Sequence, residues 1–186
     1  MKSFGRVFKN AGFTLIEILI SLAVLAIVSA SVLSNFGALS RSESTIQRAA
    51  LQFVSGVRSA QTQAVTTTDV RGDIPCGYGV HYEDGNSAFV FVSPKPFTGS
   101  CATQNRNYSA SSDQIHQTIV FSDKNIEIKS AFADIFFEPP DPRTYINNNY
   151  SADGYEDISL GFGGFNCGEA PCKTIRIYNS GRIDVI

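Results

Sequence analysis

A predominantly apolar run, FTLIEILISLAVLAIVSASVL, fills residues 13–33 near the start of the sequence. A helix of about 20 such residues is long enough to span the hydrocarbon core of a bilayer. The run contains a single charged residue, Glu17, four positions after Phe13. A carboxylate inside a membrane helix costs about 2.5–3.5 kcal/mol on insertion scales, so its presence indicates a function and a cationic partner.

The first 12 residues, MKSFGRVFKNAG, contain three basic residues and no acidic one. By the positive-inside rule, the N-terminus stays in the cytoplasm and the remainder of the chain lies outside. The run is then a secretory signal peptide cleaved near Ala30, a plain signal anchor, or a helix that stays attached when a preceding leader is removed. A plain signal or anchor has no reason to carry Glu17, so the sequence favours the third interpretation.

The segment GFTLIEILI, residues 12–20, resembles the type IV prepilin motif, in which a basic leader and a glycine precede an aromatic residue and an apolar run with a glutamate. In that family a prepilin peptidase cuts after the glycine and methylates the new amino terminus. The resemblance implies cleavage between Gly12 and Phe13, N-methylation of Phe13, and a role for Glu17 in assembly. Glu17 of a neighbouring subunit would neutralise the new amine, because opposite charges attract strongly where the dielectric constant is low.

Beyond the apolar run, apolar residues recur at steps of three and four from Phe36 to Val65, with charged and amide side chains between them. This spacing predicts an amphipathic helix, and no proline interrupts it before Pro75. We expect one helix from about Thr14 to about Val65. The sequence thus predicts four segments: a cleaved leader (1–12), a transmembrane and assembly helix (13–35), an amphipathic helix of the head (36–68), and a β-rich globular head (74–186).

From residue 74 onward, short runs of β-branched and aromatic residues alternate with turn residues, which predicts strands. Three hairpins are expected, along with single strands at 135–138 and 158–162. The stretches 97–117 and 141–157 are polar and predict exposed loops. A long helix packed on antiparallel strands is an α+β fold. The expected hairpins pair 78–82 with 88–92, 118–121 with 126–129, and 173–178 with 182–186.

Four cysteines follow the apolar run, and an even number in an exported chain indicates disulfides. Three connectivities are possible. The sequence favours Cys76–Cys101 and Cys167–Cys172, because each pair closes a local loop. The alternative is a zinc site, which is disfavoured because no CxxC pattern occurs and the two histidines are not at ligand spacing.

No catalytic or cofactor motif is found in the sequence, so neither enzymatic activity nor a cofactor or metal is predicted. His81 and His116 are interpreted as surface or packed histidines, and the acidic cluster at 153–157 as a solvated turn without a calcium-ligand pattern. Of the 15 basic residues, three precede Phe13, which leaves 12 against 17 acidic residues. This balance gives no general attraction to nucleic acid.

The closing segment KTIRIYNSGRIDVI resembles the C-terminal hairpin of the GspH/FimT group of minor pilins and pseudopilins. Some members of that group bind DNA through a second arginine two positions after a Gly-Arg pair. Here Asp184 stands at that position after Gly181 and Arg182, which argues against DNA binding.

The two resemblances together imply a structural subunit, a minor pilin, of a type IV pilus. A GspH-type pseudopilin of type II secretion is the alternative, and a pilin for DNA uptake or adhesion is a further one. The implied location is a single-pass helix in the inner membrane with the head outside, and then an extracellular or periplasmic filament. The implied partners are other pilin or pseudopilin subunits, the prepilin peptidase, the inner-membrane assembly platform, and lipid before assembly.

Overall fold

The computed structural model describes residues 14–66, 69, 72, 74–97, 100–139 and 143–186, and their side chains except those of 33–40. The predicted cleavage and methylation positions, Gly12 and Phe13, lie outside the described residues. The chain divides into two compact units, Met1–Arg41 and Ser42–Ile186, of which the second is called the head below. Each unit is described by itself.

A single helix, α1, runs from Leu15 to Val65, as predicted from the spacing of apolar residues and the absence of proline. Thr14 caps its N-terminus, since the backbone N–H of Glu17 donates to Thr14 Oγ1 over 3.3 Å. The candidate membrane span Leu15–Val32 has a mean hydropathy of 2.5, and none of it is buried within the structure. By length and composition this segment is able to cross a membrane.

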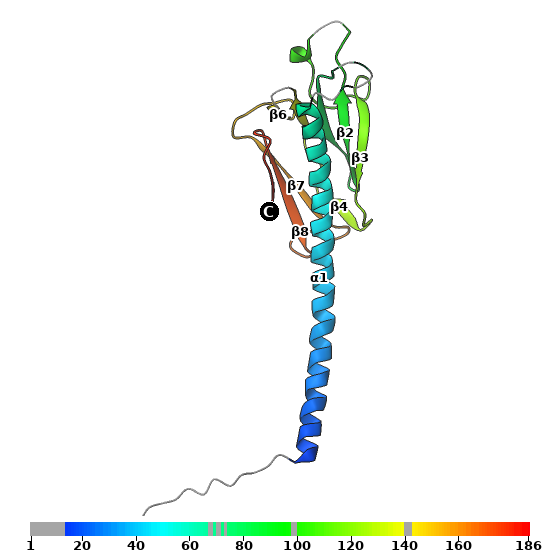
Figure 1. Ribbon diagram of the computed structural model, residues 1–186, viewed down its shortest axis with the longest axis vertical. Helices are drawn as coiled ribbons and strands as arrows, with labels where there is room; N and C mark the ends of the chain where they lie inside the picture. The colour runs from blue at the N-terminus through cyan, green and yellow to red at the C-terminus, as the bar shows by residue number, and fades with distance from the viewer. Residues whose placement is uncertain (1–13, 67–68, 70–71, 73, 98–99, 140–142) are drawn as a thin grey trace, which may run out of the picture. The chain divides into compact units, whose positions relative to one another are not determined.

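Two antiparallel sheets form the β part of the head (Figure 1). The first has the order β3-β2-β1-β5-β6, with strands Gln114–Val120, Ser87–Ser93, Gly77–Asp84, Ile135–Glu138 and Arg143–Ile146. The second has the order β4-β7-β8-β9, with strands Ile126–Ile128, Tyr155–Phe162, Cys172–Tyr178 and Ile183–Val185. The predicted α+β class is therefore confirmed.

The main core of the head lies between α1 and both sheets. Fully buried residues recur on one side of the helix at steps of three and four, as the amphipathic pattern predicts: Ile46, Ala50, Phe53, Val57, Ala60 and Ala64. They form one cluster with side chains of both sheets, including Tyr78 and Ile135 of the first and Ile158 and Ile175 of the second. Burial of this apolar surface, at roughly 25 cal/mol per Å², is the main force that holds the helix on the sheets.

Gly56 lies on the buried side of α1, where Ile119 of β3 packs against the helix backbone. A Cβ atom at this position would overlap the Ile119 side chain. The glycine weakens the helix by about 1 kcal/mol relative to alanine. In return it lets strand and helix approach closely, which explains why a poor helix former stands there.

The expected hairpin between 118–121 and 126–129 is wrong. β3 pairs with β2 in the first sheet, whereas β4 pairs with β7 in the second, so residues 122–125 connect the two sheets. The connection is a turn in which Ile126 N–H donates to the Asp123 carbonyl oxygen over 3.1 Å. A turn sequence between two apolar runs predicts that the two runs pair with each other. It does not show that the second run pairs instead with a longer strand later in the chain, here β7.

Strand β6 was missed, because it falls within the expected loop 141–157. It is a short edge strand that pairs with β5, and β7 begins at Tyr155, three residues earlier than expected. The other expected loop, 97–117, contains a short 3-10 helix at Cys101–Thr103 and the start of β3. The hairpins β1–β2 and β8–β9 are confirmed, and Ile175 and Ile177 of β8 are fully buried in the core.

Candidate functional site

Glu17 lies in the first turn of α1 and is exposed. Its carboxylate has no hydrogen-bond or ion-pair partner among the described residues. Serine hydroxyls of the same segment form hydrogen bonds to backbone carbonyls within the helix. The Ser21 hydroxyl donates to the Glu17 carbonyl oxygen over 2.8 Å, and the Ser29 hydroxyl donates to the Leu25 carbonyl oxygen over 2.7 Å. These hydroxyls therefore suit an apolar environment, whereas the Glu17 carboxylate requires a partner from outside the described chain.

The apolar side chains around Glu17 are equally unpartnered. Most residues of Leu15–Val32 are large aliphatic ones, and their exposed fractions lie between 47% for Val32 and 78% for Leu15. Exposed apolar surface on this scale marks a membrane or protein contact. Among the described residues of the N-terminal unit, the apolar helix thus presents one carboxylate without an ion-pair partner, in its first turn.

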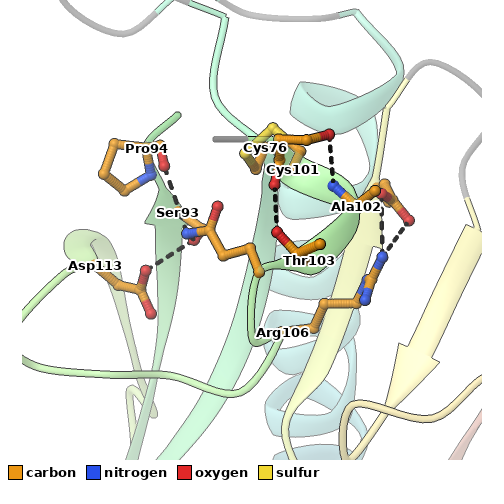
Figure 2. The surroundings of a disulfide bond; sticks show 11 residues. Cys76, Ser93, Pro94, Cys101, Ala102, Thr103, Arg106 and Asp113 are labelled. Atoms are coloured by element: carbon orange, nitrogen blue, oxygen red, sulfur yellow. Dashed lines mark hydrogen bonds and ion pairs between the residues drawn. A yellow bond between two sulfur atoms is a disulfide. The ribbon is translucent and has the colours of Figure 1, made fainter. Parts of the chain in front are cut away.

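The Cys76–Cys101 disulfide links the start of β1 to the long connection between β2 and β3 (Figure 2), and its two Cα atoms lie 5.2 Å apart. Further hydrogen bonds hold this connection. The Ser93 hydroxyl donates to the Asp113 carboxylate over 2.8 Å, and the Gln104 amide donates to Ser93 Oγ over 2.5 Å. Burial raises the pKa of the Asp113 carboxyl despite these hydrogen bonds.

A second, aromatic cluster covers the outer face of the first sheet: Phe89, Phe91 and Phe136 are buried there, with Tyr108 and Tyr145 packed on them. Tyr108 belongs to the connection 94–113. So does Arg106, whose guanidinium lies 4.0 Å from the centroid of the Tyr145 ring and 3.2 Å from the Glu138 carboxylate. The connection that sequence reasoning treated as a solvated loop therefore shields one face of a sheet.

The Cys167–Cys172 disulfide closes the loop between β7 and β8, with its Cα atoms 5.5 Å apart. Both disulfides join the cysteines that the local-loop argument favours, and no described cysteine is free. The loop presents Phe165, which is 55% exposed. Among the described residues, no group of three or more His, Cys, Asp or Glu side chains is placed to hold a metal ion.

His81 is part of a packed cluster, whereas His116 is exposed and makes a single ring contact among the described residues. His81 Nδ1 lies 2.6 Å from Asp134 Oδ1, and its ring lies 4.7 Å from that of Tyr108. His116 packs edge-on against Tyr78, with 5.9 Å between the ring centroids. Asp134 also accepts a hydrogen bond from the Tyr108 N–H over 2.6 Å, so the His81–Asp134 pair fastens the 94–113 connection to the sheet.

The outer face of the second sheet carries two arginines, and each has a carboxylate and an aromatic ring. Arg176 makes two hydrogen bonds of 2.7 Å to Asp157, which hold the pKa of that carboxyl below its usual value. Arg182 lies 2.9 Å from Asp184 and stacks on the ring of Tyr178. The acidic residue that replaces the expected second arginine therefore compensates the charge of Arg182.

Sequence reasoning missed this arrangement, because it depends on strand register. The β7–β8 register places Tyr155 opposite Tyr178 and Asp157 opposite Arg176. Aromatic and opposite-charge pairs across neighbouring strands are a common source of sheet stability. The signal in the sequence is the alternation along each strand, but only the register shows which residues meet.

Comparison with known proteins identifies the N-terminal segment. Residues 8–33 match the prokaryotic N-terminal methylation motif, which is typical of type IV pilins and pseudopilins. The motif implies processing by the prepilin peptidase and assembly with pilin subunits. It is consistent with a location in the inner membrane before assembly and in a pilus afterwards. Proteins with this motif and the pilin-like fold are typically structural and not enzymes.

A search of curated proteins and a search of solved structures gave no match. The matched motif ends at residue 33 and therefore does not extend to the head. The fold of the head is known from its own α+β architecture, which is pilin-like, with the last part of α1 packed on antiparallel sheets.

Proposed function

We propose that this chain is a structural subunit of a type IV pilus, a minor pilin of the GspH/FimT type. The prepilin peptidase cleaves it between Gly12 and Phe13 and methylates Phe13. The observation that carries the proposal is the Glu17 carboxylate, which has no partner among the described residues and lies in an unburied apolar helix within the matched motif.

Cleavage gives a mature chain that starts at Phe13, so a cationic amine stands four residues before Glu17. Before assembly, lipid covers the apolar side chains of this helix. Within a filament, apolar helices of other subunits replace the lipid, and Glu17 of one subunit neutralises the amine of its neighbour. An unpaired charge in a medium of low dielectric constant is strongly disfavoured, so the pair also fixes the axial register between subunits.

The subunit accordingly spans the inner membrane once, with its N-terminus in the cytoplasm and the head outside. Its partners are the prepilin peptidase, the inner-membrane assembly platform and other pilin subunits. The two disulfides suit a head that folds in an oxidising compartment.

A GspH-type pseudopilin of type II secretion is the alternative. The closing β8–β9 hairpin is compatible with both functions, because the group that its sequence resembles includes minor pilins and pseudopilins. Both functions require the same N-terminal helix. The copy number of the chain in purified filaments and the dependence of secretion on its gene distinguish them. DNA binding has no comparable support, because Asp184 compensates Arg182.

The test is mass spectrometry of the mature protein purified from its native membrane. The N-terminal peptide should start at Phe13 and be heavier by one methyl group, and the chain should be recovered in filaments sheared from the cells. An N-terminus near residue 30 would instead identify a secretory signal peptide and overturn the proposal.

A further inference from the structure

A groove lined by two cationic side chains lies in the head, between α1 and the turn that connects β3 to β4. Its volume is about 460 Å³. The helix contributes side chains from two successive turns, and the connecting turn contributes three consecutive residues. The lining residues are Thr45, Arg48, Ala49 and Gln52 of α1, and Ser122, Asp123 and Lys124 of the turn.

Gln52 fixes the shape of this groove. Its side-chain amide donates to Ser122 Oγ over 2.5 Å, and its carbonyl oxygen accepts from the Ser122 backbone N–H over 3.2 Å. Because these bonds join the turn to the helix at one point, Arg48 and Lys124 are positioned on two sides of the groove. Arg48 precedes Gln52 by one helical turn, and Lys124 follows Ser122 by two residues.

Neither cation forms an ion pair within the part of the chain that the structure describes. Among the described residues, five ion pairs are formed elsewhere, and none includes Arg48 or Lys124. Asp123 is the single acid of the lining, and its Oδ1 already accepts hydrogen bonds of 2.9 and 3.0 Å from Asn125. With two cations against one carboxylate in its lining, the groove keeps a net formal charge of one positive unit, on a head that carries 11 basic and 16 acidic residues.

A second, smaller and mainly apolar pocket of about 240 Å³ shares Asp123 and Lys124 with the groove and therefore lies next to it. It is lined by Val120, Phe121 and Ile126, together with Asn86. Val120 is 61% exposed, although it stands in a strand of the sheet. A cationic half next to an apolar half fits a peptide segment in which an acidic side chain stands beside an apolar one.

We propose that this groove receives an aspartate or glutamate, with an adjacent apolar residue, from the neighbouring subunit of the filament. The proposal rests on the proposed function, and it names the chemistry by which heads contact one another. A free inorganic anion would leave the apolar pocket unused. A nucleic acid requires more cations than two on an acidic head. Contacts between a groove on one subunit and a different surface on the next are the heterologous kind that builds open filaments.

Charge reversals in the full chain, expressed in the native cells, test the cationic half. We expect Arg48→Glu and Lys124→Glu to reduce the amount of the chain in sheared filaments by about tenfold or more, with an unchanged membrane-bound pool and N-terminus. Arg48→Lys keeps the charge and should be incorporated normally. Arg58→Glu is the matched control, because Arg58 is also exposed on α1 but does not line the groove. Equal incorporation of Arg48→Glu and Arg58→Glu would overturn the proposal.

A photo-crosslinking amino acid at position 120, next to the cations, tests the partner. The crosslinked peptide should belong to a filament subunit and contain an acidic residue, and replacing that residue by lysine should restore incorporation of Arg48→Glu. Crosslinks to lipid, or to a peptide without an acid, would contradict the proposal. Absence of the unmodified chain from filaments would instead contradict the proposed function, so the two failures are distinguishable.

Discussion

The two parts of α1 use apolar residues in opposite ways. In Leu15–Val32 they occupy all sides of the helix, and none of the segment is buried within the structure. In residues 46–64 they occupy one side, and the core of the head covers them. The first part depends on lipid or other subunits for its burial, whereas the second depends on strands of its own chain.

This difference separates assembly from folding. The N-terminal part contains the processing motif and the unpartnered Glu17, and its loss is not expected to disturb the core. The second part organises both sheets around itself, so changes on its buried side should unfold the head. Variants in each part of α1 test whether assembly into filaments and folding of the head are as separate as the contacts indicate.

The largest effect is expected for Glu17→Ala. Removal of the carboxylate leaves the cationic terminal amine of a neighbour unpaired, so the variant should be cleaved, methylated and inserted, yet undetectable in sheared filaments. Immunoblots of membrane and filament fractions, with mass spectrometry of the N-terminus, measure both properties. Glu17→Asp retains the charge and should recover part of the incorporation.

The denaturation midpoint of the head should be the same for Glu17→Ala and the unmodified chain, because no described residue contacts this carboxylate. A destabilised head, or normal incorporation into filaments, would show that assembly and folding are not separate in the way that α1 indicates.

The next effect concerns the buried side of α1. Phe53 is fully buried and meets Phe132 edge-on, with 5.7 Å between the ring centroids. Phe53→Ala should lower the free energy of unfolding of the head by about 3–5 kcal/mol. The chain has 7 Tyr and no Trp, so denaturant unfolding in detergent can be followed by the near-ultraviolet circular dichroism of tyrosine.

Two leucines of the same helix serve as controls for Phe53→Ala. Leu51 is 54% exposed in the head, and Leu25 is 61% exposed in the apolar part. Leu51→Ala and Leu25→Ala should each change the unfolding free energy of the head by about 0.5 kcal/mol or less. A large loss of stability in Leu25→Ala would mean that the apolar part contributes to the head.

The contrast within α1 also explains what the sequence could predict. The helix and the membrane segment follow from local spacing, and so do the two confirmed hairpins. Strand β6 and the separation of β3 from β4 do not. The run 143–146 pairs with the neighbouring strand β5, but it is short and follows the proline-rich segment 139–142, which indicates a loop. The run 126–128 acquires its partner, β7, from a distant part of the chain. Long-range pairing leaves little trace in local composition.

The distinction between local sequence signals and long-range contacts also applies to the candidate sites. Glu17 was predicted because a charge inside an apolar run is unusual wherever it occurs. The groove beside Arg48 was not, because its other cation, Lys124, follows in a turn after strand β3. The packing of Ile119 against α1 and the bonds between Gln52 and Ser122, which are 70 positions apart, bring the two cations together.

The last effects concern the two disulfides, which are both confined to the head. Chain-entropy estimates give about 3.5 kcal/mol for Cys76–Cys101, with a sequence separation of 25, and about 2 kcal/mol for Cys167–Cys172, with a separation of 5. Replacing each pair by serine should therefore lower the stability of the head in that order, as measured by denaturant unfolding. Neither replacement should alter cleavage at Phe13 or insertion, because the apolar part of α1 requires no folded head. A larger loss of stability for the Cys167–Cys172 replacement would show that contacts of the 163–171 loop in the native state outweigh chain entropy. Impaired cleavage would show that processing depends on the fold of the head.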